Sequence, residues 1–297
     1  MKRILNFGSL NTDYVYKVDH ILQGGETIQS ESRTVFPGGK GLNQSIALVR
    51  AGLSVCHAGL IGTDGEHLRD LLNQNGVDTS LIETRDMPGG HTVIQVDSSG
   101  QNSIIVFAGE NMRVLDEDIE RVLSEFNKGD LLILQKELDH SPAIMRMASE
   151  RGMTIIFNPS PVNSTLNSYP LACVDWFLLN EIEGKALTQE TEPKRILAVL
   201  KALYPNAGIV LTLGEKGSLY ADQAQKHFQP AFRVKAVDTT AAGDTFTGFL
   251  MGGLLAGRTV PEAMELAAKA SAIAVTRPGA SPSIPTLEEV LNWKGQD

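Results

Sequence analysis

The sequence predicts an α/β protein in which helices cover both faces of a mostly parallel sheet. From about residue 54 onward, short apolar runs typical of strands alternate with longer amphipathic runs typical of helices. Strands and helices that take turns along a chain form right-handed crossovers, which produce a parallel sheet between two helical layers. Two other stretches, residues 14–36 and 91–107, alternate with a period of two and predict a separate flap of antiparallel strands.

The elements of the main sheet follow from this alternation. Strands are expected in five apolar runs: LSVCHAGLI (53–61), DLLILQ (130–135), MTIIFNP (153–159), DWFLLN (175–180) and GIVLTLG (208–214). Helical spacing of apolar residues predicts helices over residues 66–75, 116–126, 142–151 and 193–203. Helix starts are predicted at Ser141 before Pro142, at Thr259 with Glu262, and at Thr286 with Glu289.

The two stretches with period two, about residues 14–36 and 91–107, are expected to form a small β-sheet lid. The segment SSGQN between two of its strands is typical of a hairpin turn. Inserted strands of this kind often lie over one edge of a parallel sheet, and their exposed edges also suit a dimer surface. Because no repeat or long linker interrupts the pattern, a single domain over residues 1–297 is expected to carry this lid.

Composition and charge exclude several classes of protein. A net charge of −9 and a pI near 5.2 argue against nucleic-acid binding, which needs clustered Lys and Arg. A polyanionic ligand would therefore need a metal cation, backbone amides or a few local positive charges. Cys56 and Cys173 lie in apolar runs without zinc-ligand spacing, which indicates core thiols in a reducing compartment. With no signal peptide and no apolar run of about 18 residues, a cytoplasmic protein without a membrane partner is expected.

One turn, AVDTTAAGDTFTGF (236–249), has very small side chains around a single carboxylate, Asp244. The preceding run FRVKAV (232–237) is expected to be a strand, and a helix is expected to begin close to Gly243. The amides of residues 241–243 would then be unpaired at a helix N-terminus, which suits an anion. Asp244 by itself fits a first-turn cap equally well. The bare turn favours a base beside an anion hole, as phosphoryl transfer requires.

A second glycine-rich turn, FPGGKGLNQ (36–44), also precedes a helical run. It is not a P-loop, because Lys40 is followed by glycine, and the first turn, FGSLNTD, lacks the GxGxxG of nicotinamide-dependent dehydrogenases. Taken alone, GGKG also fits a tight turn with an exposed lysine. Polar or minimal residues at the ends of predicted elements nevertheless form a set that suits a polyhydroxylated ligand: Asn11, Asp13, Gly39, Asn43 and Asp244.

These segments resemble the PfkB carbohydrate kinase family and, within it, ribokinase. GGKGLNQ is similar to the family's first signature and DTTAAGDTFTGF to its second, and NPSP, NEIE and TLGEKG lie between them in the family's order. The resemblance extends from GSLNTD to TRPGASPSIP, nearly the whole chain. It implies a ribokinase-like three-layer sandwich with a mostly parallel central sheet and a small β-sheet lid. It also implies an ATP-dependent kinase for the primary hydroxyl of a pentose, with D-ribose as the leading acceptor and ribose 5-phosphate as product.

The resemblance implies roles for single residues in catalysis and sugar binding. Asp244 is the implied general base, and the implied anion hole for the γ-phosphoryl group consists of Ala241, Ala242 and Gly243. Asp244 is also among the residues implied to bind the sugar hydroxyls, with Asn11, Asp13, Gly39, Lys40, Asn43 and Glu137. Asp13 suits a vicinal diol, because one carboxylate accepts from two hydroxyls. Glu137 by itself also fits a solvated loop carboxylate.

The resemblance further implies binding sites for ATP, Mg²⁺ and K⁺, whereas the exposed edges of the expected lid predict a homodimer formed through the lid. The implied nucleotide contacts are Asn180, Thr212, Gly214, Lys216, Gly217 and Gly243. Glu183 of NEIE is implied to help hold Mg²⁺ through water. The implied K⁺ ligands, mostly backbone carbonyls, are Asp238, Thr240, Ala274, Arg277, Gly279 and Ser283. Outside this resemblance, NEIE also fits an acidic helix start, and Lys216 fits an exposed turn lysine.

Two positions depart from the pattern of ribokinases. Leu42 stands where alanine is common and can narrow the sugar pocket. Glu110 stands where a small residue is usual, and either accepts a hydroxyl or faces solvent. Other acceptors therefore stay open, namely a nucleoside, deoxyribose, fructose or a ketogluconate. An inactive sugar-binding regulator is a further alternative, which loss of Asp244 would favour, but AAGD is intact.

Overall fold

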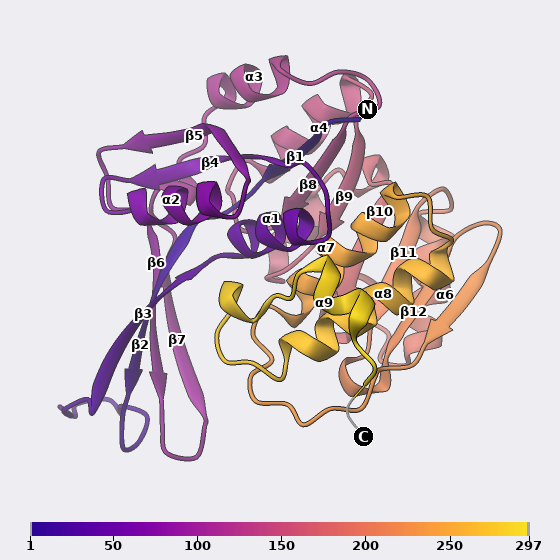
Figure 1. The fold of residues 1–297 in the computed structure, drawn as a ribbon. Helices are drawn as coiled ribbons and strands as arrows, with labels where there is room; N and C mark the ends of the chain where they lie inside the picture. The colour runs from indigo at the N-terminus through magenta and orange to yellow at the C-terminus, as the bar shows by residue number, and fades with distance from the viewer. Residues whose placement is uncertain (1, 296–297) are drawn as a thin grey trace.

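The computed structural model describes residues 2–295, so residues 1, 296 and 297 of the expected domain lie outside the described residues. Over the described chain, a nine-stranded sheet has the order β13-β12-β11-β10-β9-β8-β1-β4-β5 (Figure 1). Its strands are β1 (Ile4–Phe7), β4 (Cys56–Gly62), β5 (Asp78–Arg85), β8 (Leu131–Gln135), β9 (Thr154–Asn158), β10 (Trp176–Asn180), β11 (Gly208–Thr212), β12 (Ser218–Ala221) and β13 (Lys226–Gln229). The strands from β11 to β5 pair in parallel, and only β12 and β13 pair antiparallel, at one edge. The prediction of a mostly parallel sheet is confirmed.

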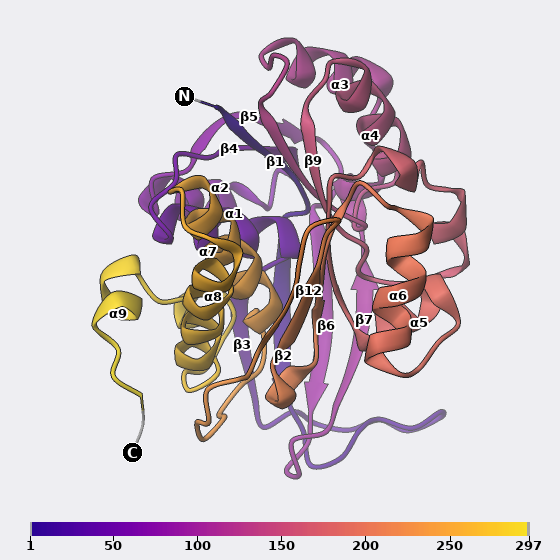
Figure 2. The ribbon, with the colours of Figure 1, turned by 90° about the vertical axis from the view of Figure 1, so that its right-hand side faces the viewer.

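Helices cover both faces of this sheet, as Figure 2 shows in side view. One layer contains α1 (Lys40–Arg50), α2 (Glu66–Gln74), α7 (Ala242–Leu255), α8 (Val260–Ala274) and α9 (Leu287–Asn292). The other contains α3 (Asp116–Ser124), α4 (Ser141–Glu150), α5 (Glu181–Thr188) and α6 (Pro193–Leu203). Short 3-10 helices lie in the connections: η1 (Gly109–Met112), η2 (Ser164–Ser168), η3 (Leu171–Cys173), η4 (Gly214–Lys216) and η5 (Ser281–Ser283). The three-layer sandwich is confirmed.

Alternating side chains of the central strands divide the core into two clusters, one on each face of the sheet. In β8, Leu131 and Ile133 join the cluster under α1 and α7, whereas Leu132 and Leu134 join the cluster under α3 and α4. All four side chains are at most 2% exposed. A strand buried on both faces is apolar at nearly every position, which explains the long apolar runs in the sequence.

The lid is a separate four-stranded sheet that projects from one end of the body (Figure 1). Its order is β3-β2-β6-β7, with β2 (Asn11–Lys17), β3 (Ser32–Gly38), β6 (Gly90–Val96) and β7 (Asn102–Phe107). The predicted hairpin turn is present, since the Asp97 amide donates to the Gln101 carbonyl at 3.0 Å. The expectation of purely antiparallel strands is wrong for the central pair, because β2 and β6 are parallel. Each antiparallel pair forms one half of the lid, and the chain between them runs through the body.

The expected strand over residues 232–237 is absent from the structure, which shows irregular chain there. Pro230 follows directly after the edge strand β13, and the chain then crosses to the start of α7. Along this crossing it has no neighbouring strand, and the amides of Val237 and Asp238 donate instead to the Val275 carbonyl at the end of α8. Apolar alternation alone was a misleading signal, because a strand also needs a partner.

The predicted helix starts are largely correct. Both capping boxes form, at Thr259 with Glu262 and at Thr286 with Glu289. Ser141 is the first residue of α4 rather than its cap, because His140 occupies the capping position. The Ser141 hydroxyl instead donates to the carbonyls of Gln135 and Leu138.

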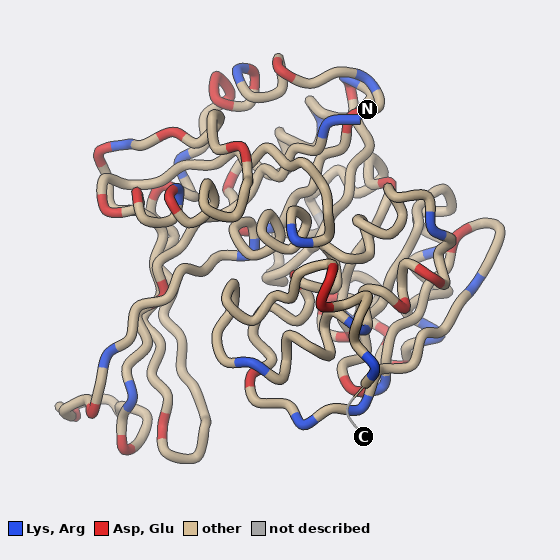
Figure 3. Tube along the Cα trace, in the orientation of Figure 1, with Lys and Arg blue, Asp and Glu red and all other residues tan. Residues whose placement is uncertain are grey.

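Two further features of the described chain are its distribution of charge and the character of its helices. Basic and acidic residues are interspersed along the trace (Figure 3). Within residues 2–295, no helix combines the length and the apolar character that a membrane span requires.

Candidate active site

The site lies where the order of the parallel sheet reverses. The strand β1 is flanked by β8 on one side and β4 on the other, and the chain leaves β1 toward the lid. Ligands of open α/β sheets bind at the carboxyl ends of strands next to such a reversal. The backbone of α1 reaches this end directly, because Gly8 and Gly41 leave no room for side chains between them. A Cβ on Gly41 would lie 2.5 Å from the Gly8 carbonyl carbon.

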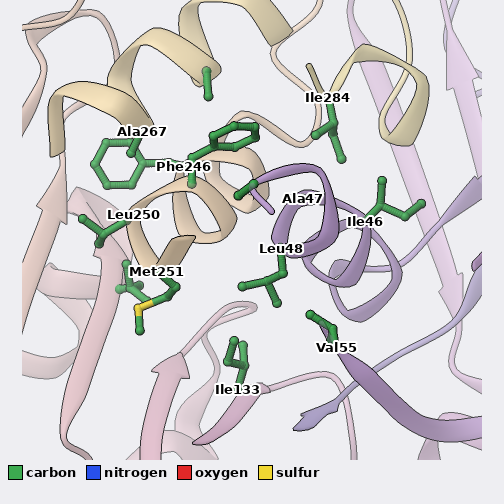
Figure 4. Close-up of a cluster of buried hydrophobic side chains, with 14 of the residues drawn as sticks. Ile46, Ala47, Leu48, Val55, Ile133, Phe246, Leu250, Met251, Ala267 and Ile284 are labelled. Atoms are coloured by element: carbon green, nitrogen blue, oxygen red, sulfur yellow. The ribbon is translucent and has the colours of Figure 1, made fainter. Parts of the chain in front are cut away.

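A close helix pair assembles the centre of the site. Helices α1 and α7 pack through small residues, with Gly248 against Ala47 and Gly252 against Ala51. A Cβ on Gly248 would lie 2.6 Å from the Ala47 carbonyl carbon, so the two backbones are in direct contact. Larger apolar side chains of both helices fill the space around this seam, as Figure 4 shows. One helical turn before Gly248 and Ala47, the first turns of α7 and α1 therefore face each other.

Asp244 is held at this point by two amide side chains of α1. Its Oδ1 accepts from Gln44 Nε2 at 2.9 Å, and its Oδ2 accepts from Asn43 Nδ2 at 3.2 Å. The residue is 7% exposed and lines a cleft of about 210 Å³. The first-turn position that the sequence left open as a simple cap thus belongs to a carboxylate that faces a cleft. Neither of its oxygens caps the backbone of α7.

The start of α7 matches the expected anion hole in part. The helix begins at Ala242, and Ala241 has a φ of 59°, a left-handed conformation that is unfavourable for alanine. The expectation of three unpaired amides is wrong for Ala242, whose N–H donates to the Thr239 carbonyl at 3.2 Å. Among the described residues, no group accepts a hydrogen bond from the amide of Ala241 or Gly243. These two donors remain for a ligand.

Gly243 leaves open space at the start of the helix. A Cβ placed on it would meet no atom within 4 Å, and its φ is not in the left-handed region. Neither packing nor backbone conformation therefore requires glycine here. The space that a side chain would fill belongs to the cleft, which fits a phosphoryl group close to the backbone.

Two charged residues, Glu137 and Lys40, lie close to each other and to Asp244. Glu137 Oε2 accepts from the Lys40 amide at 2.9 Å and from the Ser9 hydroxyl. Burial raises the pKa of Glu137, and its hydrogen bonds and the Lys40 ammonium only partly oppose this. Burial disfavours the charge of the Lys40 ammonium, but the carboxylates Asp244, Glu137 and Glu183 more than offset it and raise the pKa of Lys40. Glu137 is thus a partly buried, hydrogen-bonded carboxylate and not a solvated one.

Two polar residues expected to bind the sugar, Asn11 and Asp13, lie on β2 of the lid. Asp13 Oδ1 accepts from Thr92 Oγ1 at 2.6 Å, across the parallel β2–β6 pair. Burial raises the pKa of Asp13, and the bond from Thr92 partly opposes the shift. Asn11 is 7% exposed, and its Oδ1 accepts from Asn111 Nδ2 at 2.8 Å. Gly39, at φ 92°, precedes α1 and lies against the Asn11 amide, so this turn joins lid and body.

Only some of the residues expected to contact the nucleotide line the cleft. Its lining includes Lys40, Asn180, Glu183, Thr212, Gly243 and Asp244. The structure does not place Gly214, Lys216 or Gly217 in this lining, and Lys216 is exposed in the turn between β11 and β12, as its sequence suggested. Among these three, Gly217 has a structural requirement of its own, because its φ is 114° and its amide and carbonyl close the turn.

Glu183 combines a structural and a cleft position. It completes a capping box with Asn180, whose amide donates to Oε2 at 2.8 Å while its Nδ2 donates to Oε1 at 3.0 Å. The side chain is 4% exposed and lines the cleft. Within residues 2–295, no cluster of three or more His, Cys, Asp or Glu could hold a metal. One carboxylate with occupied oxygens fits a Mg²⁺ held chiefly by phosphate oxygens and water.

The segments proposed to bind K⁺ come together beside the start of α7. Asp238 Oδ1 accepts from the amide and the hydroxyl of Thr240, and Oδ2 accepts from the Gly279 amide at 2.9 Å. These bonds lower the pKa of Asp238 against the opposing effect of burial. The Ala274 carbonyl accepts from the Arg277 amide at 3.0 Å, and the buried Ser283 hydroxyl donates to Ala280. The Arg277 side chain pairs with Glu289.

The two departures from the family pattern have structural roles away from the ligand. Leu42 is fully buried in the apolar cluster between α1 and α7, so it does not narrow a sugar pocket. Glu110 is 1% exposed; its Oε1 accepts from the Met87 amide at 3.1 Å and its Oε2 lies 3.8 Å from Arg113 Nε. Glu110 therefore does not face solvent, and its Oε2 is buried without a hydrogen-bond partner among the described residues.

Several site residues were missed from the sequence. Gln44 was quoted within GGKGLNQ without a role, although its place beside Asn43 in a first helical turn was a usable signal. Asn158 and Ser160 of NPSP line the cleft. Ser9 and Thr92 act through contacts that depend on strand register and lid placement, for which the sequence held no signal.

Comparisons with known proteins place this site in a family. The profile of the pfkB family of carbohydrate kinases matches residues 1–287. The ribokinase of Haemophilus influenzae is 32% identical over 98% of this chain and 98% of its own. A deoxyribokinase of Salmonella typhimurium is 30% identical over 95% of each chain.

Solved structures show the same fold. The ribokinase of Cryptococcus neoformans, determined in complex with ADP, superposes with a TM-score of 0.85 at 32% identity, covering 98% of this chain and 99% of its own. The ribokinase of Arabidopsis thaliana, complexed with ribose and ATP, has a TM-score of 0.88 at 27% identity, covering 98% and 97%. The match spans both the three-layer body and the lid. The chain belongs to the pfkB family of carbohydrate kinases.

Proposed function

We propose that this protein is an ATP- and Mg²⁺-dependent kinase that phosphorylates the primary hydroxyl of a pentose, converting D-ribose to ribose 5-phosphate. The main support for this proposal is the position of Asp244 at the start of α7. Two side-chain amides donate hydrogen bonds to its carboxylate, and the space next to it, over Gly243, is open. Relatives named ribokinase support the choice of sugar, since one of them is 32% identical along nearly the whole chain.

In the proposed reaction, the base accepts a proton and the anion hole stabilises the transferring phosphoryl group. Asp244 accepts the proton of the primary hydroxyl as that oxygen bonds to the γ-phosphorus of ATP. The bond between this phosphorus and the bridging oxygen breaks, ADP leaves with the electron pair, and the proton passes later to solvent. The amides of Ala241 and Gly243 and the Lys40 ammonium stabilise the charge on the transferring group. Phosphoryl transfer asks little more of a protein than this positioning.

Residues on both sides of the turn at Gly39 are proposed to hold the sugar. Asn11 and Asp13 belong to the lid strand β2, whereas Lys40, Asn43 and Glu137 belong to the body. Asp13 retains lone pairs beyond its bond to Thr92, so it suits two neighbouring hydroxyls. A sugar that joins the two sheets would draw the lid toward the body, which excludes water from the reaction.

The nucleotide is proposed to bind along the cleft, with Asn180 and Thr212 beside it and the turn of Gly214, Lys216 and Gly217 farther out. A solved relative complexed with ribose and ATP supports this use of the fold. Glu183 would hold Mg²⁺ through water, and the metal would neutralise phosphate charge in a protein whose net charge is −9.

A K⁺ ion is proposed in the loop formed by Asp238, Thr240, Ala274, Arg277, Gly279 and Ser283. The Asp238 carboxylate is turned into this loop by its bonds to Thr240 and Gly279. The loop directly precedes the strained Ala241, so an ion there would fix the backbone from which the anion hole is built.

The acceptor is tested by a substrate panel. D-ribose, 2-deoxyribose, a nucleoside, fructose and 2-ketogluconate are each offered with MgATP, with and without KCl, and ADP release is measured. The proposal requires the largest kcat/KM for D-ribose. A larger value for another acceptor would keep the kinase and replace the sugar, and 2-deoxyribose is the specific alternative because a deoxyribokinase is 30% identical. Sugar binding without ADP release would support an inactive regulator instead.

A homodimer through the lid is proposed from its apolar outer strand. Four successive residues of β7, Ile104, Ile105, Val106 and Phe107, are each between 45% and 63% exposed. The strand is also an edge of the lid sheet. A second copy of the chain would cover both the side chains and the open edge. Light scattering of the purified protein tests this, and Ile105→Lys is expected to yield monomers.

A cytoplasmic location is proposed, because ATP and a reducing environment are found there. Cys56 and Cys173 are free thiols, and burial raises the pKa of Cys56 to about 12, so this thiol is inert.

A further inference from the structure

We propose that Gln44 and Gln135 are positioning residues that orient the base Asp244 through a one-way relay of hydrogen bonds. The inference rests on the proposed function, because it concerns the same carboxylate. Gln135 Nε2 donates to Gln44 Oε1 at 2.7 Å, and Gln44 Nε2 donates to Asp244 Oδ1 at 2.9 Å. Gln135 touches neither the cleft nor Asp244, so any effect it has on the base passes through Gln44.

The direction of this relay is fixed by chemistry. An ionised carboxylate only accepts hydrogen bonds, so Gln44 must turn its amide nitrogen toward Asp244. Its oxygen then faces Gln135, which in turn must present its own nitrogen. An amide flipped at either position would set two donors or two acceptors against each other. The two glutamine side chains are 0% and 1% exposed, and no water is needed to complete the relay.

A second branch of hydrogen bonds leaves Gln135 in the opposite direction, away from Asp244. Gln135 Nε2 also donates to Asn6 Oδ1 at 2.9 Å, and Asn6 Nδ2 donates to Ser45 Oγ at 2.8 Å and to the Gly41 carbonyl at 2.7 Å. Ser45 Oγ lies 2.7 Å from His57 Nδ1, and His57 Nε2 lies 3.2 Å from the Gly8 carbonyl. Because a carbonyl only accepts, His57 carries its proton on Nε2, and the Ser45 hydroxyl donates to Nδ1.

The hydrogen bonds of Gln135 indicate that this residue does more than fill space in the core. Both of its amide hydrogens are used, one for each branch, whereas its oxygen packs against Gly8 without a hydrogen-bond donor among the described residues. This oxygen is therefore a costly group in the core, and an apolar side chain of the same size would avoid it. A chain of aligned donors also strengthens its last bond, which here ends on the catalytic carboxylate.

The relay predicts an unequal and non-additive effect on turnover. Gln44→Met is expected to lower kcat by roughly 10- to 100-fold, the range for loss of a hydrogen bond to a charged group. Gln135→Met is expected to lower kcat less, and KM for D-ribose should stay within about 2-fold in both, because neither side chain is placed against the sugar. The double variant should have the kcat of Gln44→Met alone, because Gln135 acts only through Gln44.

The matched control is Ser45→Ala, which cuts the other branch at similar depth without touching Gln44 or Asp244. It is expected to reduce thermal stability and to leave kcat near the wild-type value. The assays use the full chain with MgATP, KCl and D-ribose, and a thermal melt accompanies each variant. If Gln44→Met does not fold, Gln135→Met and Ser45→Ala still decide the matter, since the relay requires that only the first lowers kcat.

The outcomes separate this inference from the proposed function. Wild-type turnover in Asp244→Asn would overturn the role of the base and the relay with it. An inactive Asp244→Asn combined with near-normal kcat in Gln44→Met would overturn the relay alone. Multiplying effects of the two glutamine substitutions, or a loss of kcat in Ser45→Ala as large as that in Gln135→Met, would show a general packing role and also overturn it.

Discussion

Gln44 Nε2 lies 2.9 Å from Asp244 Oδ1, and the two residues are 200 positions apart in the sequence. Asp244 stands in the first turn of α7, and Gln44 comes directly after the first turn of α1, so the contact exists only because α1 and α7 start side by side. The proposed base is thereby held by side chains of the same helix whose first turn also supplies Lys40 and Asn43. The proposed contacts to the acceptor and the proposed base therefore depend on one rigid element.

Replacing Asp244 by Asn is expected to abolish turnover with the fold retained. The change removes the base and sets an amide nitrogen against one of the two donors of α1, so kcat should fall by about 10²–10⁴. A modest loss of stability, about 1–2 kcal/mol, should accompany the mismatch. Turnover, sugar binding by calorimetry and urea denaturation are the measurements.

The matched control is Asp116→Asn, an exposed aspartate in the first turn of α3. It should change neither turnover nor stability appreciably. Near-normal kcat in Asp244→Asn would remove this residue from the reaction.

Gly243→Ala is expected to impair function without impairing the fold. The new methyl group meets no protein atom within 4 Å, so the free energy of unfolding should stay within about 0.5 kcal/mol of wild type. The methyl group would enter the proposed phosphoryl space, so KM for ATP should rise and kcat should fall, each by roughly 10-fold.

Gly248→Ala is the control for Gly243→Ala, because it is expected to reduce stability instead of ATP kinetics. Its methyl group would press on the Ala47 backbone and should cost about 1–3 kcal/mol of stability. Unchanged ATP kinetics in Gly243→Ala would mean that the phosphoryl group lies elsewhere.

His57 is expected to make the protein sensitive to mild acid. Complete burial lowers the pKa of His57 to about 4, from an ordinary value of 6.5. Between these pH values the unfolded chain binds a proton that the folded chain does not, so stability falls as pH drops from about 6.5 toward 4. The shift corresponds to about 3 kcal/mol.

Urea denaturation at a series of pH values checks this contribution. His57→Gln should flatten the decline, whereas His20→Gln, at an exposed histidine of the lid connection, should retain it. An equal slope in wild type and His57→Gln would contradict the assignment.

Arg50→Met is expected to loosen the proposed cation loop. The guanidinium at the end of α1 donates to the carbonyls of Ser281 and Ile284 and to Asn75 Oδ1. Its loss leaves buried carbonyls without donors and should cost about 2–3 kcal/mol. Because the loop carries Gly279 and Ser283, the KCl concentration for half-maximal activity should also rise, by several-fold.

Arg195→Met, at an exposed arginine of α6, is the control and should alter neither quantity. A KCl dependence in Arg50→Met that matches wild type would separate this loop from cation binding.

The sequence predicted the body of the fold well, because strands that are buried on both faces of a parallel sheet are recognisable by their apolar composition. In β8, four of the five residues are apolar and buried, and the helices between such strands have one apolar stripe. It failed at residues 232–237, where apolar alternation was present without a neighbouring strand. It also missed the parallel β2–β6 pair, since the partner of a lid strand is set by how the chain returns from the body.

For the site, the sequence indicated which segments matter but not how they touch. Asp244 was readable from the bare turn around it, and family resemblance supplied the remaining assignments, which stay predictions. Gln44, Gln135 and Ser9 were not readable, because their importance lies in contacts between distant segments. Leu42 was expected to narrow the sugar pocket, and Glu110 to accept a hydroxyl or to face solvent. Both side chains are buried instead, because a departure from a family pattern does not reveal which way a side chain points.

The seam between Gly248 and Ala47 has a consequence for how such an enzyme can change its acceptor. Backbone contact between the two helices sets the spacing of the segments that carry Asp244 and its donors, and this spacing does not depend on where the lid stands. Part of the proposed sugar-binding set, by contrast, is on β2 of the lid. Substitutions in the lid can therefore alter which sugar is accepted while the machinery for proton transfer keeps its geometry, and acceptor preference and reactivity can evolve separately.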